Sequence, residues 1–389
     1  MPNPAHDSPR QSLPAPISKR RRPRTESSWP DRRLTDLLRI EHPLVLAPMA
    51  GVGTVELAAA VCRAGGLGSI GCAAMQPQAA TQAIERLRSL AKRPINVNFF
   101  CHSPARPGPQ REQAWLGRLA PYYRELGLDA SLPIPPMDFP PFGDAMCTVV
   151  EAVRPEVVSF HFGLPDPSLL ARVKAAGCRV VSTATTVGEA RWLEERGADA
   201  IIAQGAEAGG HRGMFLAADM AAELAYQPGT FALVPQIVDA VDVPVIAAGG
   251  IADARAIGAA FALGASGVQM GTAYLLCSEA ATSPLYRQAL RGPGAALTVL
   301  TNVFTGRPAR ALVGRMTTEI GPILGEMPDF PLPMAALAPL RAKAEARGSG
   351  DFTALWAGEA AALCREMPAE ALTRALADEA REQFLSSAG

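Results

Sequence analysis

The sequence predicts an α/β protein built as a closed (β/α)8 TIM barrel, with a smaller, mainly helical lid region at the C-terminus. Between residues 43 and 270, a short apolar run followed by a segment of helical period recurs eight times. The apolar runs do not alternate with polar residues, which indicates parallel strands buried on both faces. Eight strands at nearly even spacing favour a barrel, and an open, doubly wound sheet is the competing arrangement.

The expected elements follow from this repeat. Strands are expected at 43–48, 67–71, 95–100, 157–162, 179–184, 200–204, 244–248 and 267–270. Helices are expected at 54–64, 78–91, 141–153, 166–176, 187–196, 233–241 and 253–263, with a further helix after the eighth strand.

Three regions are expected along the chain. Residues 1–33 are rich in Pro, Ser and Arg, which predicts a disordered basic tail. Residues 34–280 form the barrel, interrupted at 101–140 by an insertion of a length that is usually functional or disordered. Residues 281–389 form the lid, with helices expected near 335–346, 351–366 and 368–385.

Composition excludes several classes of protein. The 389 residues include 37 basic and 37 acidic side chains, so binding of nucleic acid through bulk charge is disfavoured. Seven cysteines without a C-x-x-C pair disfavour a disulfide framework or a zinc ribbon and fit a reducing, cytoplasmic compartment. No apolar run reaches the roughly 18 residues of a membrane span, and there is no signal-peptide pattern. We therefore expect no membrane association and no metal.

Candidate site residues come from the ends of the expected strands, because barrel enzymes carry their active sites at the carboxyl ends. In chain order they are Ala47, Pro48 and Met49, then Asn98, His161, Gln204, Gly209, His211, Gly249 and Gly250, and finally Gln269, Met270, Gly271 and Thr272.

The glycine-rich ends of the seventh and eighth strands predict a phosphate site. Glycines such as Gly249, Gly250 and Gly271 let the backbone direct several N–H groups at one anion, and a helix beginning near Asp253 adds a positive dipole end. Thr272 adds a hydroxyl donor. The alternative is that these glycines serve only tight turns.

A phosphate site without a metal motif or a strand-end lysine favours FMN over pyridoxal phosphate. The apolar turn at Ala47, Pro48 and Met49 suits the face of a flavin ring, and Asn98 and Gln204 supply amides for its polar edge. Both amides could instead be buried polar groups satisfied by the barrel itself.

His211 is the candidate catalytic residue. It follows Gly209 and Gly210 on a loop at the barrel mouth, where an imidazole can exchange a proton with a ligand. A structural loop histidine is the alternative. His161 is either part of the pocket or a hydrogen-bonded core residue, and Glu207 either orients a group in the site or caps the loop.

These residues resemble those of the nitronate monooxygenase family. The resemblance covers roughly residues 38 to 320 and is carried by six segments, namely 47–51, 96–102, 157–163, 204–213, 267–272 and 304–310. It implies noncovalent FMN near Asn98, Gln204, Gly209, Gly250 and the stretch from Gln269 to Thr272, with His211 as the catalytic histidine.

The resemblance also implies a reaction. Members of the family oxidise alkyl nitronates with O2 to a carbonyl compound and nitrite without NAD(P)H, which implies a role in nitroalkane detoxification. Tyr274, and with it Tyr122 and Tyr123, is expected to close the substrate pocket. The expected partners are a small nitronate and O2, with a homodimer as a candidate assembly.

Two other functions stay open on the sequence. The loop that contains His211 is shared with FMN-dependent NAD(P)H reductases of enoyl-[acyl-carrier-protein] or quinones. A non-catalytic flavin-binding or sensory protein is the third candidate.

Overall fold

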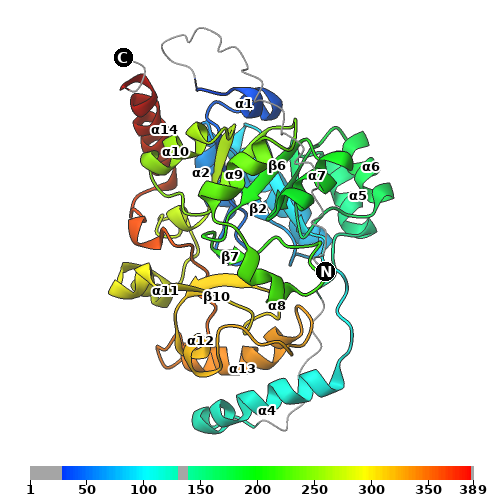
Figure 1. The fold of residues 1–389 in the computed structure, drawn as a ribbon, viewed down its shortest axis with the longest axis vertical. Helices are drawn as coiled ribbons and strands as arrows, with labels where there is room; N and C mark the ends of the chain where they lie inside the picture. Colours follow the sequence, from blue (N-terminus) through cyan, green and yellow to red (C-terminus); the bar gives the residue numbers. More distant parts are fainter. Residues whose placement is uncertain (1–28, 130–138, 387–389) are drawn as a thin grey trace, which may run out of the picture.

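The computed structural model describes residues 29–129 and 139–386, and within them eight parallel strands close into the predicted barrel (Figure 1). In sheet order the strands are β1 (Leu44–Leu46), β9 (Gly267–Met270), β8 (Val245–Ala248), β6 (Ala200–Gln204), β5 (Arg179–Ala184), β4 (Val157–His161), β3 (Ile95–Phe100) and β2 (Gly68–Gly71). Closure is made at Leu67, which donates to the Leu44 carbonyl and accepts from the Leu46 N–H, both at 2.9 Å. The (β/α)8 prediction is therefore confirmed.

The strands bury both faces, as continuous apolar runs require. Leu44 and Leu46 face the outer core beneath the helices, whereas Val45 between them belongs to an inner cluster with Val181 and Ile202. The bottom of that inner cluster is closed by apolar residues in and just after α1 (Arg33–Leu38). The interior of the barrel is thus a packed core at this end.

A ring of helices surrounds the strands. Its members are α2 (Val55–Arg63), α3 (Pro77–Ala91), α5 (Asp144–Val153), α6 (Pro167–Ala175), α7 (Val187–Glu195), α9 (Thr230–Val238) and α10 (Ala254–Ala262). The side chains of Thr54, Thr186 and Asp253 cap α2, α7 and α10 at their N-termini. The ring is completed between α10 and α2 by α14 (Ala369–Ser386), from the end of the chain (Figure 1).

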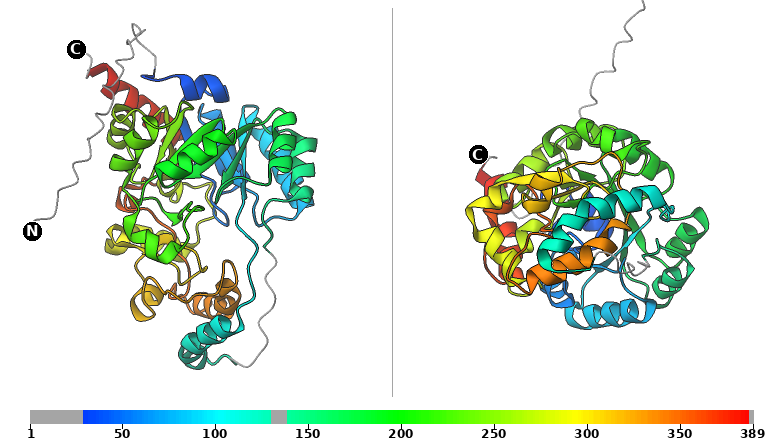
Figure 2. Two further views of the ribbon diagram at one scale, coloured as in Figure 1. Left: turned by 45° about the vertical axis from the view of Figure 1, so that its right-hand side comes forward. Right: turned by 90° about the horizontal axis from the view of Figure 1, so that it is seen from below.

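A second layer lies beyond the carboxyl end of the barrel. Three short strands form an antiparallel sheet in the order β10 (Thr298–Thr301), β11 (Ala309–Leu312) and β7 (Gly210–His211). Below it, α4 (Pro109–Leu126) from the long insertion packs on α13 (Pro333–Glu345), and Figure 2 shows both helices across the barrel mouth. The insertion and the C-terminal region therefore build one structure over the site.

The remaining short elements connect these layers. They are α8 (Met220–Glu223), α11 (Pro284–Arg291), α12 (Arg315–Glu319) and the 3-10 turns Leu224–Tyr226, Thr272–Tyr274, Pro293–Ala296 and Ala361–Leu363. No helix within the described residues is both long and apolar enough to cross a bilayer.

Several expectations need correction. A helix at 351–366 is wrong, because the segment forms turns and the 3-10 turn Ala361–Leu363. The tail prediction lies mostly outside the described residues, but Trp29 within it is only 7% exposed and stacks on Phe261 at 5.7 Å between ring centroids. Sequence patterns missed α4 and the three-stranded sheet.

Candidate active site

A cavity of about 630 Å³ opens at the carboxyl ends of the barrel strands. All fourteen candidate residues predicted from the strand ends line this cavity. They are Ala47, Pro48, Met49, Asn98, His161, Gln204, Gly209, His211, Gly249, Gly250, Gln269, Met270, Gly271 and Thr272. The ends of the barrel strands therefore form one wall of this cavity.

The opposite wall comes from the C-terminal region, and no role was predicted for its residues. They include Phe304, Thr305, Phe330, Met334, Leu337, Phe352 and Trp356. The first two belong to the segment 304–310 that carries part of the family resemblance, which is the signal that could have identified them. Most of this wall is apolar and aromatic, which suits the alkyl part of a small substrate.

His211 is held from both of these walls. It lies in β7, which pairs with β11 at Ala309, and its carbonyl accepts hydrogen bonds from His161 Nε2 at 3.1 Å and Gln204 Nε2 at 3.0 Å. Its ring Nε2 lies 2.9 Å from Thr305 Oγ1. Burial lowers the pKa of His211 to about 3, and the nearby charge of Arg307 acts in the same direction. The imidazole is therefore neutral at neutral pH.

His161 lines the cavity and is also fully hydrogen-bonded, so both alternatives for it hold. Its Nε2–H donates to the His211 carbonyl, which leaves Nδ1 to accept from the Thr183 hydroxyl at 3.1 Å. Burial lowers its pKa to about 3. With neither ring nitrogen free, His161 positions the backbone of His211.

Two guanidinium groups are buried behind these histidines. Arg212 is fully buried and donates to the carbonyls of Gln204 and Gly205, with Nη2 to Gln204 at 2.7 Å. Arg307 lies over the ring of Phe162 at 3.9 Å. Burial lowers the pKa of each to about 10, so both stay charged at neutral pH, and neither forms an ion pair within the described part of the chain. The carboxylates of Glu189, which acts on both groups, and of Glu207, which acts on Arg212, offset part of this charge. The two guanidinium groups themselves favour an anion in the site.

The residues present fit a phosphorylated flavin. Gly249 and Gly250 have φ of +110° and +70°, a conformation that supports an anion-binding backbone nest. A Cβ on Gly249 would come within 2.8 Å of Thr230 Oγ1, so only glycine fits there. Gln269 lines the cavity and its buried Oε1 has no hydrogen-bond partner, so a donor on a bound group would satisfy it.

Three polar side chains expected at the cofactor also serve the protein itself. Asn98 Nδ2 donates to the Ser159 carbonyl at 3.1 Å, and Thr272 Oγ1 accepts from Gly358 N–H at 3.0 Å. Gln204 Oε1 accepts from Gly213 N–H at 2.8 Å, so its amide fixes both sides of the loop that contains His211. Glu207 accepts from the Thr230 N–H and hydroxyl, so it braces the loop, and it also lines the cavity.

The tyrosine predictions are wrong. Tyr274 is fully buried in the outer core, where its hydroxyl pairs with Thr373 Oγ1 at 2.9 Å, because the 3-10 turn after β9 directs it away from the cavity. Tyr122 and Tyr123 pack between α4 and the C-terminal region, with the Tyr123 hydroxyl on the Ala336 carbonyl at 2.6 Å. Within the described residues, no group of three or more His, Cys, Asp or Glu side chains could hold a metal ion.

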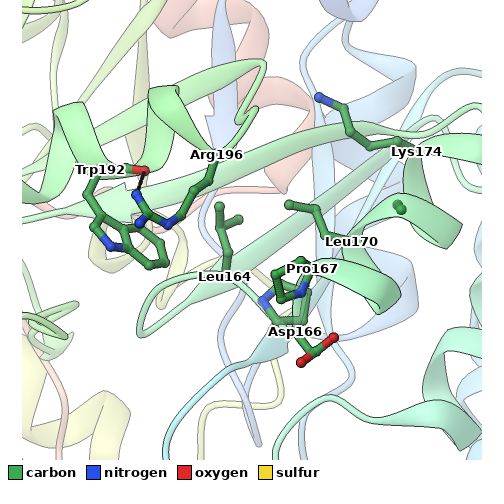
Figure 3. Close-up of a pocket in the computed structure, with 9 residues that line it drawn as sticks. Leu164, Asp166, Pro167, Leu170, Lys174, Trp192 and Arg196 are labelled. Carbon is green, nitrogen blue, oxygen red and sulfur yellow. Dashed lines mark hydrogen bonds between the residues drawn. The ribbon is translucent and has the colours of Figure 1, made fainter.

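A second hollow of about 530 Å³ lies on the outside of the barrel between α6 and α7 (Figure 3). Leu164, Pro167 and Leu170 supply its apolar floor, and Arg196 covers the ring of Trp192 at 4.1 Å. None of the predicted site residues lines this hollow, so the cavity at the strand ends is the candidate active site.

Known proteins are similar to this chain over nearly its whole length. A family model described as nitronate monooxygenase matches residues 31–379. A nitronate monooxygenase of Pseudomonas aeruginosa is 45% identical over 351 residues, which cover 90% of this chain and 99% of the relative. Among solved structures, nitroalkane oxidase from Streptomyces ansochromogenes has a TM-score of 0.83 at 39% identity, covering 91% and 99% of the two chains. FabK from Thermotoga maritima has a TM-score of 0.67 at 31% identity, covering 92% and 98%.

Proposed function

Because the chain belongs to the nitronate monooxygenase family, we propose that it oxidises alkyl nitronates with O2 to a carbonyl compound and nitrite, using FMN. It is an oxidoreductase, as its relatives are.

The observation that carries the proposal is the charge of the site. A nitronate is an anion, and the neutral ring of His211 lies in a cavity backed by the buried cations Arg212 and Arg307. A neutral imidazole can donate one N–H to a nitronate oxygen, and the field of the guanidinium groups stabilises the same negative charge. The site therefore favours the binding of an anionic nitronate.

The cofactor would lie across the strand ends. Gly249, Gly250 and Gly271 would hold its phosphate, and Gln269 would accept a hydrogen bond from its polar edge. Bound FMN would supply the electron transfer that links the nitronate to O2. The protein's own contribution is to orient the anion beside His211 and to surround its alkyl part with apolar side chains.

An anaerobic titration tests this proposal. The purified protein is loaded with FMN, and its visible spectrum is followed after adding ethyl nitronate or, in a separate cuvette, NADPH. Bleaching by the nitronate but not by NADPH, with nitrite released in air, is the expected result. Bleaching by NADPH alone would contradict the proposal and indicate an FMN-dependent NAD(P)H reductase instead.

A pair of histidine variants makes the test specific to the site. His211→Asn should keep FMN and lose roughly 10²-fold or more in turnover of nitroethane, the usual contribution of a positioned acid or base. His42→Asn is the control, because His42 is also buried but precedes β1 at the opposite end of the strands. Equal turnover of nitroethane by wild type and His211→Asn would contradict the role of His211.

A further inference from the structure

We infer that the Thr305 hydroxyl is the tautomer switch of His211, which lets this ring either donate a hydrogen bond to a nitronate or accept the α-proton of a nitroalkane. The inference rests on the proposed function and adds a positioning residue to it. Thr305 lies in the connection between β10 and β11, is only 4% exposed, and lines the cavity.

The hydroxyl oxygen of Thr305 has three polar neighbours. His211 Nε2 lies at 2.9 Å, and the N–H and the carbonyl of Arg307 both lie at 3.3 Å. A hydroxyl offers one proton and two lone pairs, and one lone pair accepts from the Arg307 N–H. The single proton then goes either to the Arg307 carbonyl or to His211 Nε2.

Each choice fixes a different tautomer of His211. If the Thr305 proton goes to the Arg307 carbonyl, Oγ1 accepts from His211 Nε2–H, and Nδ1 carries a lone pair that can take a proton. If the proton goes to Nε2, Nδ1 carries the hydrogen and can donate it to an anionic oxygen. Nδ1 has no hydrogen-bond partner among the described residues, and His211 lines the cavity, so Nδ1 is the nitrogen left for a ligand.

The ring of His161, by contrast, is held in one tautomer. Its Nε2 faces a carbonyl, which accepts only, so its ring has a single satisfied neutral tautomer. The ring of His211 faces a hydroxyl, which can donate or accept. Because both histidines are neutral at neutral pH, the difference between them is one of tautomer and not of charge.

The first test reads the tautomer directly. Protein labelled with ¹⁵N-histidine and loaded with FMN is compared by long-range ¹H–¹⁵N spectra in wild type, Thr305→Val and Thr305→Ser. The His211 signals are those missing from His211→Asn. Wild type and Thr305→Ser should show averaged shifts from two exchanging tautomers. Thr305→Val should shift to the Nδ1–H form, because a buried N–H at Nε2 without a partner is strongly disfavoured.

The second test compares two substrates. Thr305→Val should lose about 10²-fold in kcat/KM for nitroethane, which needs the base form, and much less for ethyl nitronate, because the Nδ1–H form still donates to its oxygen. Thr305→Ser should restore both. Thr301→Val is the control, since Thr301 is also buried and, within the described part of the chain, its hydroxyl has a hydrogen bond only with the nearby Val303 N–H at 3.3 Å.

Two outcomes would overturn the inference. One is a His211 spectrum with a single tautomer in wild type that Thr305→Val leaves unchanged, and the other is an equal loss on both substrates. Failure of wild type to oxidise nitronates would instead refute the proposed function, while the spectra would still decide the role of Thr305.

Discussion

Acidification should destabilise the folded protein through the histidines that it buries in neutral form, and His102 is the clearest case. Its side chain lies beside the active-site aromatic residues and is only 4% exposed. Its Nε2 lies 3.0 Å from the Phe139 carbonyl, and its ring packs edge-on against Phe330 at 4.9 Å between centroids. Burial lowers the pKa of His102 from its ordinary value to about 4.

The sign of the effect follows from proton binding. Between about pH 6.5, the ordinary pKa of histidine, and pH 4, the unfolded chain binds a proton at His102 that the folded chain excludes. The free energy of unfolding therefore falls as the pH falls. From pH 7 to pH 5 the loss from His102 alone is about 2 kcal/mol. His161 and His211, whose pKa values are also lowered, act in the same direction.

Urea unfolding at pH 7, 6 and 5, followed by tryptophan fluorescence at one FMN concentration, measures this loss. His102→Gln keeps an N–H for the Phe139 carbonyl and cannot titrate, so its stability should fall by about 2 kcal/mol less than that of wild type. Phe99→Leu truncates a buried ring that packs on Phe142 and Phe160 and has no ring contact with a histidine among the described residues, so it should keep the wild-type pH dependence. An equal loss in wild type and His102→Gln would refute the argument.

Two further substitutions test the anion field and the cofactor site. Arg307→Met removes a buried charge and should raise KM for nitronates about tenfold with a smaller change in kcat, measured by steady-state kinetics, and an unchanged KM would argue against the field. Gly209→Ala should lower the flavin content after gel filtration, because its Cβ would lie 2.5 Å from the backbone nitrogen of Gly358. Gly117→Ala, where a Cβ meets nothing within 4 Å, is the control, and equal flavin content in both variants would contradict this reading.

The barrel could be predicted from sequence because its strands carry their own signal. The runs expected at 95–100, 179–184, 200–204 and 267–270 coincide with observed strands, because strands buried on both faces are rich in apolar residues even where buried polar side chains such as Asn96, Asn98 and Ser182 interrupt them. Strand β7 is only Gly210–His211, and it exists because β11 lies beside it. Such short strands depend on contacts with residues distant in the sequence, so no local sequence pattern predicts them.

The segment 351–366 was expected to be a helix, but no such helix forms. Its Ala, Leu and Glu content is typical of a helix, but its backbone is used elsewhere. Gly358 N–H donates to Thr272 Oγ1 at 3.0 Å, and Glu359 N–H donates to the Glu207 carbonyl at 3.0 Å. These bonds attach the segment to the barrel mouth, and tertiary contacts override the helical propensity.

The residues of the candidate site also fall into two groups, those that the sequence predicts and those that it does not. Residues at strand ends were found because the barrel fold places them at one mouth whatever their neighbours are. Thr305 and Arg307 lie in a connection of the C-terminal region, and nothing in the residues around them indicates which loop they will meet. Tyr274 is a related case, because its place after β9 follows from the sequence but the direction of its side chain does not.

His211 is held by both the barrel and the C-terminal region, and each fixes a different part of it. The barrel fixes the backbone of His211, because His161 and Gln204 both donate to its carbonyl. The C-terminal region fixes the ring, because Thr305 contacts Nε2 and the rings of Phe330 and Trp356 pack at 5.5 and 5.3 Å between centroids. Gly249, Gly250 and Gly271, which are expected to hold the phosphate, lie against barrel residues, whereas Gly209 packs against Gly358 of the C-terminal region. Substitutions in the C-terminal region can therefore change how His211 handles a proton, while the glycine phosphate cradle of the barrel stays intact.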